Sequence, residues 1–472
     1  MTPVELTPLE WMGQWWDDEA GMLWNPRGSF DALFPHRTVH LVPPTIWYAL
    51  GLLGRQADGD VDRALHAFRA VIGCQLDEPG APWHGTYARF LEFPHPQAGA
   101  AEYIGYDPNW RQFVGTGMAL AVLEYGELLP AADASAMVAS LALAVAGEPP
   151  DRVDASYSNI ALMRAWLEVH TGLLLDRDDL VERGSDLAGR IVERFDRHDC
   201  VDEWNSPTYY GIDLYALRLW ATRSSGLRDA GARIERAVWD DFAPWYHASL
   251  RNIAGPYTRA YGMDMRRYVA AVGLWIGEVA PAPLPDLGGG FSHSHDLSLA
   301  PVVQLLGASP SPHAVEMLRS FTDERQLERQ VSSDPERIAT AWLGPDLMIG
   351  AERGGRRWSA RGQYHPVTVH WRDPTSRVRW MRMIHTGPVD AVAGRGQLRV
   401  VSGAHARRGF QPTSFLLSAA LHVQAERWEL PGLTVLVSTD AQFVGAHASG
   451  ELTDARYEPD QTGMATFELS FF

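Results

Sequence analysis

The chain has 472 residues, of which 46% are hydrophobic and 21% charged, and its formal net charge is −17. This length exceeds what one hydrophobic core ordinarily serves, so we expect two domains. An excess negative charge of this size disfavours nucleic acid and anionic membranes as partners.

The cysteine content and the hydropathy of the segments limit which cellular compartment and which cofactors we expect. Only Cys74 and Cys200 are present, so no disulfide framework and no cysteine-based zinc site is encoded. Residues 1–10 lack a basic region followed by an apolar run, and no apolar stretch reaches the ~20 residues that a membrane helix needs. We therefore expect a cytoplasmic protein, although a chain trimmed of a leader would look the same. We assign no cofactor and no metal, and a homo-oligomer is left open.

Residues 1–280 have the apolar spacing of a helical domain. Segments 61–75 and 178–195 carry a charged face, as outer helices do, whereas 112–128 and 211–222 are more apolar throughout, as inner helices are. Residues 76–105 form an insertion rich in Pro, Gly, His and Tyr, which we expect to pack over a functional site. The predicted helices cover 45–53, 61–75, 112–128, 132–146, 159–171, 178–195, 211–222, 229–250 and 264–279.

A repeat runs through this helical region. Four entrance segments, rich in aromatic, amide, acidic and Arg residues, each lead into an apolar helix, at 106–111, 154–159, 203–210 and 257–264. Asn109, Tyr157, Tyr209 and Tyr261 follow one another at steps of 48, 52 and 52 residues. A second helix fits inside each step, which is typical of an array of helical hairpins. If alternate helices form an inner ring, the four entrance segments lie at the same end of it.

The pattern of apolar residues changes after the helical region. Residues 281–335 are predicted to be a linker with one or two short helices, beginning with a run rich in Pro and Gly. Residues 336–472 contain short alternating runs separated by turn residues, which favour an antiparallel β-sandwich. The predicted strands cover 366–371, 378–384, 397–401, 414–417, 433–438 and 465–471.

An (α/α) toroid of hairpins at 1–280, followed by a linker and a β-sandwich, resembles the toroid-plus-sandwich polysaccharide lyases. This broad class includes alginate, heparin, chondroitin and hyaluronan lyases, and the resemblance is one of architecture over nearly the whole chain. It implies β-elimination on a uronate-containing oligo- or polysaccharide. In that class a Tyr removes the proton next to the uronate carboxyl group, and an Asn, often with His or Arg, neutralises the carboxylate.

The entrance segments supply the residue types that this chemistry needs. We expect Tyr209 or Tyr210 to be the base, Asn205 to bind the carboxyl group, and Arg259 with Tyr261 to clamp the substrate. A Tyr with its ordinary pKa of ~10 is a poor base at neutral pH, so Arg259 or Arg111 would have to lower that pKa. The predicted substrate-binding residues are Asn109, Trp110, Arg111, Tyr157, Asn159, Tyr257, Asp264, His84 and Tyr87.

Other functions remain open on the same scaffold. An inverting glycoside hydrolase would use two acids ~6.5–9.5 Å apart, with Glu203 and either Asp264 or Asp154 as candidates. After the lyase and the hydrolase, a third hypothesis is a small-molecule cyclase, isomerase or dehydratase. A fourth is a protein that binds sugars without catalysing a reaction. His293-Ser294-His295-Asp296 has alternate imidazoles that could share a face, but this spacing leaves metal binding open.

Overall fold

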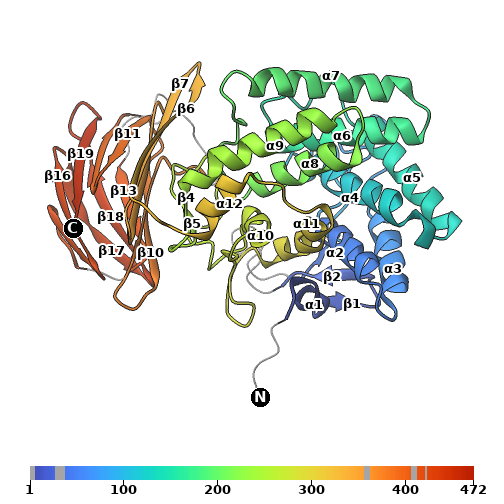
Figure 1. Cartoon of the computed structure of the whole chain (residues 1–472), viewed down its shortest axis with the longest axis horizontal. Coiled ribbons are helices and arrows are strands. Elements are labelled where there is room, and N and C mark those ends of the chain that lie inside the picture. The colour runs from blue at the N-terminus through green and yellow to red at the C-terminus, as the bar shows by residue number, and fades with distance from the viewer. Residues whose placement is uncertain (1–5, 27–37, 356–361, 405–411, 420–421) are drawn as a thin grey trace.

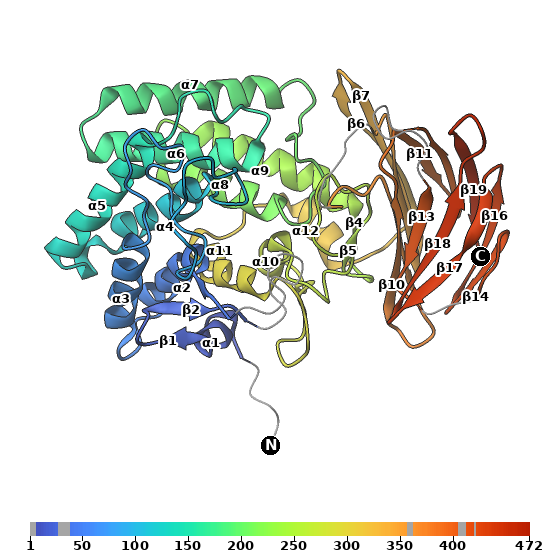
Figure 2. The same cartoon turned by 180° about the vertical axis from the view of Figure 1, so that it is seen from behind.

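A computed structural model describes residues 6–26, 38–355, 362–404, 412–419 and 422–472. Figure 1 shows the helices gathered on one side and the large sheets on the other, and Figure 2 shows the same division from behind. Helical and antiparallel-sheet content therefore agrees with the predicted fold class, while the toroid itself stays a prediction. None of the helices in the described residues combines the length and the apolar character needed to cross a membrane.

The helices form hairpins that stack side by side. The helices that contact one another in succession are α2 (Val42–Arg55), α4 (Trp110–Tyr125), α6 (Ser158–Leu174), α8 (Tyr210–Arg223) and α10 (Ala271–Gly277). Each of the first four also contacts the helix that follows it, which is α3 (Asp60–Ile72), α5 (Ala131–Ala146), α7 (Asp178–Phe195) or α9 (Arg228–Phe242). The contacts return to α2 through a 3-10 helix, η3 (Ser294–Leu299), and α11 (Ala300–Leu306).

Burial separates the two sets of helices as the sequence predicts. Helix α6 is buried from Ser158 to Gly172, so it lies inside the array. Helix α7 buries only one stripe, at Leu180, Gly184, Leu187, Ala188, Ile191 and Phe195. The helices approach closely at Gly184, where an added Cβ would meet the Ala165 carbonyl oxygen at 2.7 Å. Glycine is therefore required for the contact between α6 and α7.

Two predicted helices differ from the structure at the end of the helical region. The helix predicted over 229–250 ends at Phe242, since Pro244 follows and cannot continue the hydrogen-bond ladder. The helix predicted over 264–279 begins only at Ala271. The segment before it is irregular, and Gly262 packs against the Tyr268 ring so closely that an added Cβ would lie 2.4 Å from it. Tyr261 therefore lies in a loop and not at a helix entrance.

Short elements complete the helical side. The N-terminal ones are α1 (Pro8–Gly13), β1 (Trp16–Asp17), β2 (Met22–Trp24) and β3 (His40–Leu41). Two short 3-10 helices, η1 (Gly126–Leu128) and η2 (Ala243–Trp245), follow α4 and α9, and β4 (Tyr246–His247) pairs with β5 (Asn252–Ile253). Helices α11 and α12 (Pro312–Arg319) are the short helices expected before the sandwich.

Two antiparallel sheets form the C-terminal side. The larger has the order β17-β18-β13-β10-β9-β8-β7-β6, and the smaller has the order β11-β12-β19-β16-β15-β14. Both sheets contribute to one hydrophobic core, with Phe415 and Trp371 from the first and Phe467 and Trp428 from the second. The first strand of these two sheets, β6, begins at Arg325, inside the segment predicted to be a linker with short helices. The strands are β6 (Arg325–Ser333), β7 (Glu336–Leu343), β8 (Leu347–Arg353), β9 (Val367–Arg372), β10 (Val378–Ile384), β11 (Val389–Gly394), β12 (Gln397–Ser402), β13 (Thr413–Leu417), β14 (His422–Val423), β15 (Arg427–Leu430), β16 (Leu433–Thr439), β17 (Gln442–Ser449), β18 (Leu452–Glu458) and β19 (Ala465–Phe471).

The larger sheet packs directly on the helical side. Tyr257 and His365 exchange two backbone hydrogen bonds of 2.9 Å, which join the loop after β5 to the loop before β9. The backbones of Gly255 and Gly350 approach so closely that a Cβ on Gly350 would lie 2.0 Å from the Gly255 carbonyl oxygen. These contacts bring the loops and strand β10 of the sandwich over the helical array.

Candidate functional site

A cavity of about 870 Å³ lies where the entrance segments meet. Asn109, Tyr157 and Tyr209 directly precede α4, α6 and α8, and all three line the cavity together with Tyr261. The repeat therefore placed four residues correctly at one end of the array, even though the fourth lies in a loop. The wall also contains Leu41, Pro43, Pro44, Trp47, Arg89, Phe90, Tyr103, Asp107, Trp110, Phe113, Asn159, Ile160, Thr208, Ile212, Arg259, Ala260, Ala271, His293, His295, Asp296, Leu299, Gly362, Gln363 and Arg382.

Two phenols and a guanidinium form the polar centre of this wall. The hydroxyl oxygens of Tyr209 and Tyr261 share a hydrogen bond of 2.7 Å. Arg259 Nη2 donates to the Tyr209 hydroxyl at 2.8 Å, and the Arg259 guanidinium carbon lies 3.9 Å from the centre of the Tyr209 ring. Tyr261 is 37% exposed, so it is the more exposed member of the pair, while Tyr209 is half-buried and also lines the cavity.

A second layer holds Arg259 in place. Glu203 accepts a hydrogen bond of 3.1 Å from Arg259 Nη1. It also accepts from the backbone and the side-chain amide of Asn159. Gln363 Oε1 accepts from the other side of the guanidinium at 3.3 Å. Because Glu203 is buried and not part of the cavity wall, its carboxylate acts on a ligand only through Arg259.

The other two entrance residues are joined in the same way. Asn109 Nδ2 donates to the Tyr157 hydroxyl at 3.0 Å, and Asn109 Oδ1 accepts from Arg152 at 2.9 Å. Arg152 is in turn paired with Glu148. Neighbouring entrance segments are therefore linked in pairs by side-chain hydrogen bonds, which fixes the ring and amide positions on this wall.

Burial sets the protonation states at the site. Burial raises the pKa of Tyr209 well above its ordinary value, and Tyr261 adds to this effect, while Arg259 opposes it. The expectation that a neighbouring Arg gives a Tyr base with a lowered pKa is therefore wrong for the free protein. Burial would lower the pKa of Arg259, but Tyr209 and Glu203 outweigh it, so the guanidinium stays charged.

The cavity wall contains two acids and three guanidiniums, which together set its local charge. Burial raises the pKa of Asp107, and it raises the pKa of Asp296 to about 7. Three guanidiniums, Arg89, Arg259 and Arg382, line the same cavity. The local field is therefore more positive than the net charge of the chain suggests, and the cavity suits a ligand that carries an anionic group.

Three of the predicted catalytic residues lie outside the cavity wall: Glu203, described above, Asn205 and Tyr210. Asn205 has a left-handed backbone (φ 53°), and its amide nitrogen donates to the carbonyls of Ala254 and Pro256, so this buried side chain stabilises a loop and does not bind a carboxyl group. Tyr210 is 2% exposed and packs edge-on against Phe242. Helix α8 therefore presents Tyr209 to the cavity and Tyr210 to the core.

Five predicted substrate-binding residues also have structural environments outside this cavity. The Arg111 side chain is completely buried and donates to the carbonyls of Pro82 and His84, so it ties down the insertion and is not part of the cavity wall. Tyr257 donates to the Ile253 carbonyl, and Asp264 accepts from Asn252. His84 faces Asp77, and Tyr87 shares a hydrogen bond with Ser140. By contrast, Asn109, Trp110, Tyr157 and Asn159 do line the cavity.

No sequence pattern predicted the wall residues that come from distant segments. Arg89 belongs to the insertion at 76–105, which was expected to cover the site, but no motif singled out Arg89 itself. Gln363 and Arg382 come from the sandwich, and Arg382 lies 3.2 Å from His365 Nε2. Only the packing of the sheet on the helices brings them to the cavity, so no spacing within the chain could identify them.

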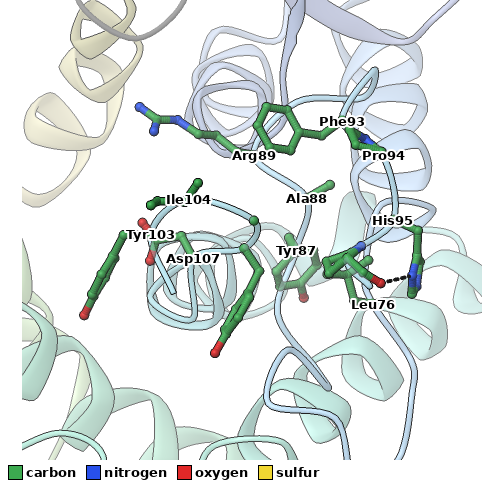
Figure 3. A pocket seen from close by; sticks show the side chains of 13 residues that line it. Leu76, Tyr87, Ala88, Arg89, Phe93, Pro94, His95, Tyr103, Ile104 and Asp107 are labelled. Atoms are coloured by element: carbon green, nitrogen blue, oxygen red, sulfur yellow. Dashed lines mark hydrogen bonds between the residues drawn. The ribbon is translucent and has the colours of Figure 1, made fainter. Parts of the chain in front are cut away.

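The insertion also builds a smaller apolar pocket of about 120 Å³ beside the cavity. Figure 3 shows Arg89, Phe93 and Pro94 on one side of it and Tyr103, Ile104 and Asp107 on another. Arg89, Tyr103 and Asp107 line both spaces. Tyr87 lies in this pocket, and Arg89, Phe90 and Tyr103 of the insertion line the larger cavity. That the insertion covers a functional site stays a prediction.

The sequence of residues 5–308 matches a protein family described as Domain of unknown function (DUF8769). The chain belongs to this family. The matched residues include helices α1 to α11 and the entrance segments, so the residues around Tyr209 and Tyr261 lie within the family domain. A comparison with curated proteins found no match.

A comparison with solved structures found two lyases and a glucanase among its matches. Heparinase III is 8% identical, with a TM-score of 0.43 over 88% of this chain and 74% of that one. The Streptomyces coelicolor A3 chondroitin AC lyase, solved with chondroitin sulphate, is 10% identical, with a TM-score of 0.44 over 98% and 78%. Endoglucanase CelQ from Clostridium thermocellum, solved with cellotetraose, is 8% identical, with a TM-score of 0.27 over 91% and 82%. Likeness at this level does not assign an activity.

Proposed function

We propose that this protein is a carbohydrate-active lyase that cleaves a uronate-containing saccharide by β-elimination. One observation carries the proposal: the hydrogen-bonded pair of Tyr209 and Tyr261 lies against Arg259 in the wall of a large cavity. Phenols transfer protons, and a guanidinium binds carboxylates with two parallel hydrogen bonds. Trp47, Trp110 and Phe113 in the same wall supply flat apolar faces for sugar rings.

The reaction requires one proton to leave carbon and another to reach oxygen. A base removes the proton next to the uronate carboxyl group, the electron pair forms the double bond, and the bond to the 4-linked oxygen breaks. The departing oxygen then takes a proton. We assign both transfers to the Tyr209–Tyr261 pair, with Tyr261 nearer the ligand because it is the exposed member.

Binding of the carboxylate falls to the guanidiniums. Arg259 already donates to Tyr209, Glu203 and Gln363, so it positions the phenol pair. Arg382 faces the cavity from β10, and we assign it the uronate carboxylate. This replaces Asn205, whose amide is occupied in the loop. A neutralised carboxylate makes the adjacent proton more acidic, which the elimination needs.

The structure places the candidate acids of the hydrolase hypothesis outside the cavity wall. Glu203 is paired with Arg259, Asp264 accepts from Asn252, and Asp154 accepts from the Ser156 backbone. None of these three residues is in the cavity wall. Two carboxyl groups, Asp107 and Asp296, do line it, so hydrolysis is the outcome against which the proposal must be tested.

The test is ultraviolet absorbance during incubation with a panel of uronate-containing glycans and short oligosaccharides. Elimination creates a conjugated 4,5-unsaturated uronate, so absorbance should rise on at least one substrate. New reducing ends without a rise in absorbance would establish hydrolysis and overturn the proposal. No change on any substrate, combined with thermal stabilisation by an apolar small molecule, would overturn it in favour of small-molecule chemistry.

A further inference from the structure

A cluster of two imidazoles and a carboxyl group lies in the cavity wall beside the phenol pair. His293, His295 and Asp296 each offer one ligand atom, and these atoms all lie within 4.8 Å of one another. His295 Nε2 is 3.3 Å from Asp296 Oδ1. All three residues line the cavity, so a group bound among them is reachable by a ligand. The proposed elimination does not use them.

His293 has an unsatisfied polar atom at this point. Its Nδ1 is buried and has no hydrogen-bond partner within the part of the chain that the structure describes. A buried nitrogen without a partner costs ~1–3 kcal/mol, so it requires an explanation. The imidazole is stacked on the Tyr261 ring, with centroids 4.4 Å apart and planes 5° from parallel, which fixes its orientation.

The distances suit the coordination sphere of a small divalent ion. Zinc binds histidine nitrogen and carboxylate oxygen at ~2.0–2.2 Å, so neighbouring ligand atoms in a tetrahedral site are about 3.3–3.5 Å apart. The His295–Asp296 separation of 3.3 Å already has this value. The widest separation in the cluster would have to close by at most roughly 1.4 Å, which side-chain rotation can supply.

The geometry points to a site for a divalent transition metal ion of the zinc type, held by His293, His295 and Asp296 with a remaining position open to the cavity. Two imidazoles with one carboxylate select zinc or a similar borderline ion over calcium or magnesium, which prefer oxygen ligands. Three protein ligands and an open position are the pattern of a site that also binds substrate or water.

Charge near the cluster acts in both directions. Arg89 lines the same cavity and lies near enough to both imidazoles to oppose an added cation. The Asp296 carboxylate offsets this effect once the ion is bound. The inference does not depend on the elimination reaction, since metal binding can be measured without substrate.

The experiment measures metal content and affinity of the full chain. After treatment with a chelator, the protein is titrated with Zn²⁺, and bound metal is measured by elemental analysis. Binding of Co²⁺ is followed by its visible absorption. We expect about one equivalent, with affinity reduced tenfold or more in His295→Ala and Asp296→Asn. His313→Ala, which alters an exposed histidine of α12, should bind as the unaltered chain does.

Two results would overturn the inference. One is metal uptake well below one equivalent by the unaltered chain in either titration. The other is equal affinity in His295→Ala, Asp296→Asn and His313→Ala. Circular dichroism checks the fold of each variant. If a variant fails to fold, His293→Gln, which replaces the His293 imidazole with an amide, is measured in its place. Loss of tight binding in a folded His293→Gln protein supports the site.

Discussion

The Tyr209 hydroxyl accepts a hydrogen bond from Arg259 and shares another with Tyr261. The neighbouring Tyr210 lies in the core, although the sequence presents the two tyrosines as equivalent candidates. Helical geometry separates them, because successive residues of a helix point about 100° apart. The distinction gives a matched pair of variants at adjacent positions.

Tyr209→Phe and Tyr261→Phe should each lower kcat/KM on the active substrate by ~10²–10⁴-fold, the usual contribution of a positioned proton donor or acceptor. Tyr210→Phe should retain activity within a few-fold, since its ring still fills the core. Steady-state kinetics measures all three. Undiminished elimination by a folded Tyr209→Phe/Tyr261→Phe double variant would remove the phenols from the mechanism.

The pH dependence of kcat/KM follows from the burial of Tyr209. A phenol must lose its proton before it acts as a base, and burial raises the pKa of Tyr209 above its ordinary value. Activity should therefore increase with pH and still be rising near pH ~9, below the ordinary Tyr pKa of ~10. A pH–rate profile of the unaltered enzyme provides the check, and a plateau already reached below neutral pH would assign the base to another group.

At the scale of elements, the repeat predicted four residues of the cavity wall. The steps between Asn109, Tyr157, Tyr209 and Tyr261 placed these four residues in one wall, because each hairpin returns the chain to the same end. The spacing could not predict that Asn205 turns inward at a left-handed residue, nor that α10 begins only at Ala271. Backbone turns of this kind depend on tertiary contacts.

Strand β10 supplies a residue that no local pattern predicts. Arg382→Gln should raise KM for a uronate substrate roughly 10- to 100-fold with a smaller change in kcat, because one hydrogen-bonded charge pair is lost. Arg377→Gln, which removes an exposed pair with Glu451 just before β10, serves as the control and should leave KM unchanged. Equal KM values in the two variants would exclude Arg382 from carboxylate binding.

The junction between β8 and the loop after β5 allows no side chain at Gly350. Gly350→Ala should destabilise the protein by ~1–3 kcal/mol, because its Cβ would overlap the Gly255 carbonyl. Gly189→Ala lies in α7 with nothing within 4 Å of the added Cβ, and it should stabilise by ~0.4–1 kcal/mol. Denaturant unfolding measures both changes, and similar stabilities would argue against this close packing.

At the scale of the whole molecule, the helical side and the larger sheet share one hydrophobic core. Residues of α6 and α8 belong to the same buried cluster as Ala339, Ala341 and Met348 of the sheet. The chain length predicted two domains, and the two sheets do enclose a core of their own. The length could not predict that the other face of the larger sheet joins the helical core, since that depends on contacts between distant segments. The site lies at this junction and takes Gln363 and Arg382 from the sandwich.

Because one face of the larger sheet is buried in the helical core, the chain should unfold in a single cooperative transition. Scanning calorimetry should give a calorimetric enthalpy equal to the van't Hoff enthalpy. Two resolved transitions, one with the enthalpy expected of the helical side alone, would show instead that the sheet contributes little to the stability of the helices.

The most direct test of the proposed elimination is the mass of the products formed in water enriched in heavy oxygen. Elimination moves protons and electrons within the substrate, so the products should contain no oxygen from water, and one of them should carry a double bond. Incorporation of one heavy oxygen per cleaved linkage, without a double bond, would establish hydrolysis and contradict the roles assigned to Tyr209, Tyr261 and Arg382.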